Sequence, residues 1–409
     1  MMEVNMNNMT IIIEGHLIDS GLLSNLLNLI VDENLDYHID KITVGKTKVE
    51  TTRAEITIFA EDQESLELVL TKVSPLGAHE KGAVDAVFER AIKDAHAPEG
   101  FYSSTNHRTE IYFGSKWNPV QSQRMDAVII KKDHGFECTK IRDIKKGDFI
   151  LCGSESVRVY PPAAEMKEDD FAFMTNEVSS ERSYDIAVDT IARELKQIKE
   201  DGGKCIVVCG PVVVHTGGAP ALSALIREGY IQGFLGGNAV AVHDLESFYY
   251  GTSLGVDTKT GKPTHGGHNH HMRAINRING FGSIKKAMEA GDLKEGLMYQ
   301  VEKSKIPYCL AGSIRDDGPL PETVNDMIEA QSQYAQIIKG ADMILMLSSM
   351  LHSIGTGNMT PSWVKTVCID INPAVVTKLA DRGSGQAIGI VSDVGLFLNA
   401  LAGRLNLKL

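Results

Sequence analysis

Six short segments that are almost wholly apolar recur in the second half of the chain, and they constrain its fold more than any other feature. Stretches with helical periodicity separate them. A strand that is apolar on both faces has to be covered on both faces, as in a parallel sheet wrapped by helices. We therefore expect an α/β fold with a doubly wound parallel sheet over residues 175–409. The expected strands are 205–209, 234–242, 308–311, 343–347, 367–371 and 388–391.

The first part of the chain has a different pattern. Strand candidates at 10–14, at 37–44, around Ile56 and at 86–90 alternate with two helical stretches, which predicts a ferredoxin-like βαββαβ unit over residues 1–100. Short strands broken by turn residues follow at 127–130, 136–141 and 148–152, with no convincing helix. They predict a small β-rich domain over residues 101–165, and the charged segment 161–170 reads as a linker.

Composition excludes several classes of function. The 41 Lys and Arg residues against 53 Asp and Glu residues give a net charge of −12, and no basic block offsets it, so nucleic acid or an anionic membrane is not an expected partner. No apolar run approaches the roughly 18–20 residues of a membrane helix, and the first residues lack the features of a secretory signal. The six cysteines lie mostly in strand-like runs, as reduced buried thiols do. We expect a cytoplasmic protein.

Glycine and polar residues follow the predicted strands. In an open parallel sheet, ligands bind at the carboxyl ends of the strands, so these segments are the candidate site. Glycines there let backbone N–H groups approach phosphates, and an acidic residue at a strand end suits a ribose diol. Together the segments predict a dinucleotide site. No Gly-x-Gly-x-x-Gly follows the first strand, so the cofactor has to bind in another manner than in the usual Rossmann fold.

Histidines supply the candidates for proton transfer and for metal binding. His215, His243 and His352 each follow a strand run, and for these the structural and the proton-handling interpretations both stay open. The loop with His265, His268, His270 and His271 could coordinate zinc, but its irregular spacing favours a solvated or substrate-facing loop, and we predict no metal site. Cys205 and Cys209 point to the same strand face, which suits packing more than redox exchange.

The strand-end motifs resemble a known family. The motifs are Gly-Gly-Asn-Ala (236–239), Arg-Asp-Asp-Gly (315–318), Met-Leu-His-Ser-Ile-Gly-Thr-Gly-Asn (350–358), Ile-Asp-Ile-Asn (369–372) and Ser-Asp-Val (392–394). They are similar to those of archaeal-type ornithine cyclodeaminases and of the cyclodeaminase portion of cyanobacterial bifunctional arginine dihydrolase/ornithine cyclodeaminases. The N-terminal part resembles a lysine-ketoglutarate reductase/saccharopine dehydrogenase-related domain.

This resemblance implies a fold, a cofactor and a reaction. The fold is an NAD-binding domain of the deoxyhypusine-synthase-like type, and the cofactor is tightly held NAD. The reaction converts L-ornithine to L-proline and ammonia, with hydride removed from the α-carbon and later returned. The NAD contacts that the family motifs imply are Asn238, Ala239, Asp317, Met350, Leu351, His352, Asp370, Asp393 and Val394.

The acid and base are our own choice from the residues, because the resemblance supplies none. His215, Asp316, Asp244 and His243 are expected at strand ends that face the cofactor. Two alternatives stay open: an NAD-dependent dehydrogenase or transferase of the saccharopine or deoxyhypusine type, and a non-catalytic nucleotide-binding regulator. Analogy with deoxyhypusine-synthase-like domains also predicts a homo-oligomer.

Overall fold

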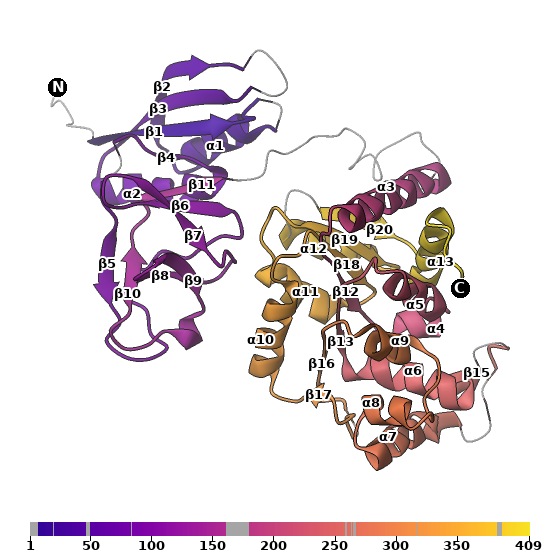
Figure 1. Cartoon of the computed structure of the whole chain (residues 1–409). Coiled ribbons are helices and arrows are strands. Elements are labelled where there is room, and N and C mark those ends of the chain that lie inside the picture. Colours follow the sequence, from indigo (N-terminus) through magenta and orange to yellow (C-terminus); the bar gives the residue numbers. More distant parts are fainter. Residues whose placement is uncertain are drawn as a thin grey trace, which may run out of the picture. The chain divides into compact units, whose positions relative to one another are not determined.

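The computed structural model describes residues 7–18, 20–45, 50–82, 84–160, 180–257, 260–262, 264, 267–316, 318–382 and 387–409. The chain divides into two compact units (Figure 1). The first comprises residues 1–171 with 358–363 and 384–386, and the second comprises the remainder. The predicted linker at 161–170 lies outside the described residues. The division of the N-terminal part at residue 100 stays a prediction.

A four-stranded antiparallel sheet opens the first unit. Its strands are β1 (Asn7–Gly15), β2 (Asp36–Thr43), β3 (Thr52–Ala60) and β4 (His79–Glu80), in the order β2-β3-β1-β4. Helices α1 (Leu22–Asp32) and α2 (Gln63–Val73) form the crossovers. Their apolar stripes bury Leu26 and Leu70 against strand residues such as Ile11 and Ile56. This is the predicted βαββαβ order.

The predicted last strand of that sheet is wrong. Residues 86–90 contain β5 (Val87–Arg90), which pairs with β10 of the second sheet, and β4 closes the first sheet instead. A two-residue strand is too short to show alternation, whereas β5 is apolar enough to look like a sheet member.

A second sheet of seven strands completes the first unit, in the order β11-β6-β7-β9-β8-β10-β5. The predicted strands correspond to β8 (Val128–Lys132), β9 (Gly135–Thr139) and β10 (Phe149–Cys152). Three further strands were not predicted, because polar residues interrupt their short apolar stretches: β6 (Arg108–Tyr112), β7 (Trp117–Gln121) and β11 (Val157–Tyr160). A single 3-10 turn, η2 (Ile141–Asp143), is the only helical element among the described residues between β6 and β11.

The second unit is built on a seven-stranded parallel sheet, which confirms the predicted fold class. Its order is β17-β16-β13-β12-β18-β19-β20, and every pairing in it is parallel. The strands are β12 (Cys205–Cys209), β13 (Gly233–Gly237), β16 (Tyr308–Ala311), β17 (Thr323–Val324), β18 (Met343–Leu347), β19 (Lys365–Asp370) and β20 (Ala387–Val391).

Helices cover both faces of this sheet (Figure 1). On one face α3 (Ser180–Glu200), α5 (Ala219–Arg227) and α13 (Val394–Arg404) pack together, and on the other lie α10 (Met327–Ile338), α11 (Met350–Met359) and α12 (Pro373–Arg382). The main core joins strand residues such as Val207 and Leu345 to the apolar stripes of these helices. The remaining helices of this unit are α4 (Val212–His215), α6 (Asn238–Tyr250), η3 (Gly267–Asn269), α7 (His270–Phe281), α8 (Ile284–Glu289) and α9 (Leu297–Ser304).

One predicted strand was too long. The segment 234–242 is strand only to Gly237, and Asn238 begins helix α6. The apolar run continues into the helix because Val240 and Ala241, which belong to α6, are also buried. A buried helix and a buried strand look alike in composition, so periodicity could not mark the boundary.

The strand order places a topological switch point between β12 and β18. From β12 the chain builds outward through β13, β16 and β17, then returns to β18 and builds the other way, and ligands bind at such a switch point. The backbones that follow the two strands nearly touch there. A Cβ on Gly210 would lie 2.0 Å from the carbonyl oxygen of Ser348, so only glycine fits at this position.

None of the helices in the described part of the chain combines the length and apolar character that a bilayer crossing requires.

Candidate active site

Two histidines meet where β12 ends. His215 is the last residue of α4, which directly follows β12, and His243 lies in the second turn of α6. Their ring centroids are 4.8 Å apart in an edge-to-face arrangement. Nδ1 of His215 also lies 2.5 Å from the hydroxyl oxygen of Ser253. The structure therefore brings together two residues that the sequence analysis selected from separate strands.

A buried carboxylate lies behind this pair. Glu246 is fully buried, one turn after His243 on the same face of α6, and its Oε2 lies 2.9 Å from Nδ1 of His243. The other oxygen, Oε1, accepts hydrogen bonds from the hydroxyl of Thr252 and from the N–H of Gly255, each at 2.9 Å. The N–H of Leu254 donates to Oε2 at 3.2 Å.

A third histidine joins through Thr252. Nδ1 of His270, the first residue of α7, lies 2.8 Å from the hydroxyl oxygen of Thr252. The His270 ring stacks on Tyr250, with centroids 4.8 Å apart. Tyr250 lies on α6 seven residues after His243. His243, Glu246 and Tyr250 therefore occupy positions i, i+3 and i+7 on one face of this helix, which faces the cluster.

Two members of the cluster, His215 and Glu246, have shifted pKa values. Burial, together with the neighbouring His243, lowers the pKa of His215 to about 4, so this ring is neutral near pH 7. Although burial alone would raise it, the hydrogen bonds from His243, Gly255 and Thr252 hold the pKa of Glu246 below its ordinary value. A neutral imidazole beside an ionised, hydrogen-bonded carboxylate is an arrangement that can accept and release protons.

A second group surrounds His352, in the first turn of α11 after β18. Its Nδ1 lies 3.1 Å from the hydroxyl of Tyr334, which donates to the carbonyl of Gly236 at 2.8 Å. A Cβ on Gly237 would lie 2.8 Å from Nε2 of His352, so this ring packs against the end of β13. Burial lowers the pKa of His352, and the charge of Asp316 opposes that effect.

The predicted acidic residues lie at the carboxyl edge but differ in their contacts. Asp316 closes a turn after β16, where its Oδ2 accepts the N–H of Ser313 at 2.7 Å. Asp370 ends β19 and accepts the N–H of Asn372 at 2.8 Å. Asp393 caps α13 by accepting the N–H of Leu396 at 2.9 Å.

The other predicted cofactor contacts divide into buried and exposed residues. The amide oxygen of Asn238 accepts from the N–H of Leu320 and from the hydroxyl of Thr323, so it links α6 to the segment before β17. Val394 is fully buried. Ala239, Met350 and Leu351 are exposed, and the exposed fraction of Leu351 reaches 75%.

The position predicted for Asp244 is wrong. It does not follow a strand but lies inside α6, pointing away from the histidines, and it is 3% exposed. Its two oxygens accept the N–H groups of Leu297 and Met298, each at 2.8 Å, at the start of α9. Asp244 therefore caps a neighbouring helix. Burial raises its pKa to about 6.

Several predicted residues fall outside what the structure describes. Asp317 and His265 are among them, as is the side chain of His268, and His271 is partly exposed in α7. Over the described residues alone, no group of three or more His, Cys, Asp or Glu side chains could hold a metal ion. Of the predicted histidine loop, the structure brings His270 into the cluster.

Sequence reasoning missed Glu246, Thr252, Ser253 and Tyr334. Only Glu246 left a signal, because it follows His243 by three residues and a helix places the two on one face. The apolar run up to residue 242 hides that signal, because it indicates a strand instead of a helix.

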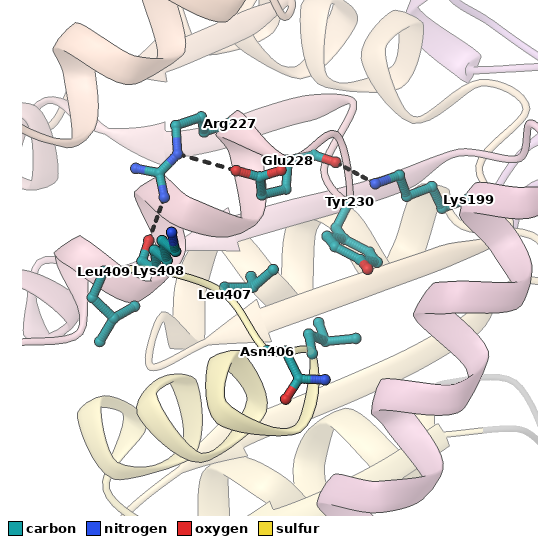
Figure 2. A pocket seen from close by; sticks show the side chains of 9 residues that line it. Lys199, Arg227, Glu228, Tyr230, Asn406, Leu407, Lys408 and Leu409 are labelled. Carbon is teal, nitrogen blue, oxygen red and sulfur yellow. Dashed lines mark hydrogen bonds and ion pairs between the residues drawn. The ribbon is translucent and has the colours of Figure 1, made fainter.

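One surface hollow lies elsewhere. It has a volume of about 600 Å³ and is lined by the ends of α3 and α5 and by residues 405–409. Figure 2 shows Arg227 bridging Glu228 and the Lys408 carbonyl, with Lys199 on the Glu228 carbonyl. The C-terminal ends of α3 and α5 lead into β12 and β13, so they lie where these strands begin. The hollow is therefore at the amino edge of the sheet, remote from the histidine cluster.

Comparison with protein-family models covers nearly the whole chain. Residues 189–401 match the model described as arginine dihydrolase ArgZ-like, C-terminal, Rossmann fold, and residues 108–188 match the first region of the same C-terminal part. Residues 8–107 match the conserved region of the LOR/SDH bifunctional enzyme.

Known proteins are similar over the same extent. The ornithine cyclodeaminase of Methanocaldococcus jannaschii is 49% identical, with 95% of this chain and 94% of that protein covered. The bifunctional arginine dihydrolase/ornithine cyclodeaminase ArgZ of Synechocystis is 46% identical over 98% of this chain, and the crystal structure of apo ArgZ matches with a TM-score of 0.85. The ternary complex of AgrE with ornithine and NAD+ matches with a TM-score of 0.54 at 46% identity over 98% of this chain. The chain spans 58% of the length of ArgZ and of AgrE.

Proposed function

The chain belongs to the family that unites the archaeal ornithine cyclodeaminases with the C-terminal part of the ArgZ-like arginine dihydrolases, and we propose that it is an NAD-dependent ornithine cyclodeaminase. The proposed reaction converts L-ornithine to L-proline and ammonia. The observation that carries the proposal is the end-to-end similarity to an archaeal protein of almost the same length, together with the histidine pair in contact at the switch point.

The residues present fit a dinucleotide. The candidate contacts follow strands on both sides of the switch point between β12 and β18, where ligands bind in open parallel sheets. The exposed apolar side chains of Met350 and Leu351 can cover an aromatic base, and the carboxylate of Asp370 suits a ribose diol. We assign NAD to Asn238, Ala239, Asp317, Met350, Leu351, His352, Asp370, Asp393 and Val394.

The position of Asp370 also supports a mode of NAD binding that differs from the usual Rossmann mode. In that mode a carboxylate ends the strand beside the first one, but here Gly237 ends β13 and the carboxylate ends β19 in the other half of the sheet. The adenosine is therefore assigned to the β18–β20 half. When bound, NAD supplies the removal of hydride from the α-carbon of ornithine and its later return.

The chain's own residues handle protons. Ornithine carries two ammonium groups, and its δ-amine attacks carbon only after losing a proton. We assign the acceptance of that proton to His215 or His243, whose rings are in contact, and the holding of an ammonium group to Asp316. Asp244 is withdrawn from this set because it caps α9.

The test is ornithine that carries deuterium at the α-carbon. If the hydride leaves and returns within one site, proline retains much of the label and free NADH does not accumulate. Accumulation of NADH with substrate would identify a dehydrogenase instead, and binding without turnover would identify a regulator. Either result would overturn the proposal.

Cellular location and assembly are further parts of the proposal. An enzyme that depends on the NAD pool, with six cysteines that are all buried free thiols, fits the cytoplasm. We also propose that the protein works as a homo-oligomer.

A further inference from the structure

The carboxylate of Glu246 can only accept hydrogen bonds, and it accepts four. The donors are Nδ1 of His243, the hydroxyl of Thr252, and the N–H groups of Leu254 and Gly255. Because an ionised carboxylate has no proton to give, His243 has to carry its proton on Nδ1. When its ring is neutral, its Nε2 is then a proton acceptor.

The same logic reaches one residue further. The Thr252 hydroxyl has a single proton, and that proton points to Oε1 of Glu246. The oxygen of Thr252 therefore accepts a hydrogen bond from Nδ1 of His270, 2.8 Å away. His270 is thus also held with its proton on Nδ1, and its Nε2 is likewise left as an acceptor.

We propose that Glu246 is the positioning residue of the site, which sets the tautomers of His243 directly and of His270 through Thr252, so that both present an unprotonated Nε2 for proton transfer. The tautomers themselves follow from the contacts alone, whereas their use in ornithine chemistry rests on the proposed function. Glu246 is fully buried and does not itself take part as a catalytic residue.

The groups that face this carboxylate are limited. From α6 it faces His243, from the β14 segment (Thr252–Ser253) it faces Thr252, and through these it is linked to His215 of α4 and His270 of α7. Glu246 is the only acidic residue with a hydrogen bond to either histidine among the described residues. Because the carboxylate only accepts and the hydroxyl has one proton, each contact along this chain has a defined donor and acceptor.

The first test measures the tautomers without substrate. The protein is labelled with ¹⁵N-histidine, and long-range ¹⁵N–¹H spectra are recorded at alkaline pH, where the rings are neutral. His243→Gln and His270→Gln assign the two signals. Both residues should show the Nδ1–H tautomer in the unmodified protein. An Nε2–H tautomer at His243, the form usual for free histidine, would overturn the proposal even if every variant failed to fold.

Variants then test the source of the effect. In Glu246→Gln the amide N–H₂ has to replace one of the two accepting oxygens, so His243 or His270 should change tautomer. Thr252→Val should change His270 and leave His243 unaltered, and Thr252→Ser should restore His270. Glu137→Gln is the matched control, because Glu137 lies near the exposed His134 on the first unit. Unchanged tautomers in both Glu246→Gln and Thr252→Val would refute the role of Glu246.

An activity measurement separates this inference from the proposed function. Glu246→Gln should lower kcat by about 100-fold, the lower end of what general acid–base catalysis contributes, and should leave NAD affinity unaltered. If the unmodified protein does not convert ornithine, the proposed function fails while the tautomer result still stands. If it converts ornithine and Glu246→Gln keeps full kcat with altered tautomers, the positioning role is refuted.

Discussion

At the scale of single residues, His215 shows how burial prepares a proton acceptor. Its ring touches another histidine and a serine hydroxyl in a partly buried position, which favours the neutral form. A neutral ring is available to accept a proton at the pH where ornithine is fully charged. Because the folded protein holds this ring neutral, protonation of His215 at low pH should destabilise the fold.

The first prediction is a pH-dependent contribution of His215 to stability. Its pKa is about 4 in the folded protein and about 6.5 in an unfolded chain. Between these values the unfolded state binds more protons, so the free energy of unfolding falls as the pH falls through this window. His215→Gln should make that decline shallower, measured by urea unfolding at pH values of about 7 and about 5.

His134→Gln is the control for this measurement, because His134 is exposed on the first unit. The pKa of His79 is also lowered to about 4, but His79 is present in every variant, and the comparison removes its effect. An equal pH dependence in His215→Gln and the unmodified protein would contradict the neutral buried state.

The second prediction concerns Asp370 and NAD. Asp370→Ala removes a carboxylate whose hydrogen bonds to a ribose, being charge-assisted, contribute about 1.5–3 kcal/mol. The dissociation constant for NAD, measured by calorimetry, should therefore rise by about 10-fold to 100-fold. Asp342→Ala is matched, because Asp342 also accepts one backbone N–H, from Lys204, but at the amino edge of the sheet. Equal NAD affinity in both variants would remove Asp370 from the cofactor site.

At the scale of elements, one face of helix α6 carries residues of the candidate site, and another face carries a residue that stabilises a neighbouring helix. His243 and Glu246 face the cluster at the end of β12, whereas Asp244 faces α9. Residues that are neighbours in the sequence therefore serve different purposes. Only the helical period of 3.6 residues distinguishes them.

The third prediction follows from that separation. Asp244→Ala leaves two buried N–H groups of α9 without an acceptor, and the free energy of unfolding should drop by about 1–3 kcal/mol. Asp62→Ala, which removes an exposed cap of α2, should cost less. Under conditions where both variants are folded, NAD affinity and kcat should match those of the unmodified protein. A kcat lowered by several orders of magnitude would return Asp244 to the list of catalytic residues.

The elements differ in how well the sequence predicts them. The strands of the parallel sheet are buried on both faces, so their apolar runs stand out, and five of the six were placed to within two residues. The exception, 234–242, failed because β13 and α6 are both buried and share one apolar run. Strands such as β7 in the second sheet are partly exposed and carry polar residues, so they left no apolar run to detect.

The site was predictable only in outline. The rule that ligands lie at strand ends selected His215 and His352 and placed both at the correct edge. It could not select Glu246 or Tyr334, because these act from inside helices through contacts that only the packing creates. A sequence pattern locates the edge of a sheet, whereas side-chain partners across helices depend on the tertiary structure.

At the scale of the whole molecule, apolar side chains lie exposed where ligands and subunits are expected. Leu351, Ile371 and Leu396 follow the neighbouring strands β18, β19 and β20, and their exposed fractions are 75%, 71% and 67%. Bound NAD can cover the exposed side chains that lie nearest the switch point between β12 and β18. Leu396 faces outward from α13, and we expect a further surface to cover it.

The last prediction is that a second copy of the chain provides that surface. Sedimentation equilibrium should give a multiple of the chain mass of 44.6 kDa, with or without NAD. Burial of large apolar side chains stabilises an interface by roughly 25 cal/mol for each Å² removed from water. Leu396→Glu places a charge on that surface and should shift the equilibrium toward the monomer, whereas Val31→Glu, at an exposed apolar position of α1, should not. A mass of 44.6 kDa for the unmodified protein under both conditions would contradict the predicted assembly.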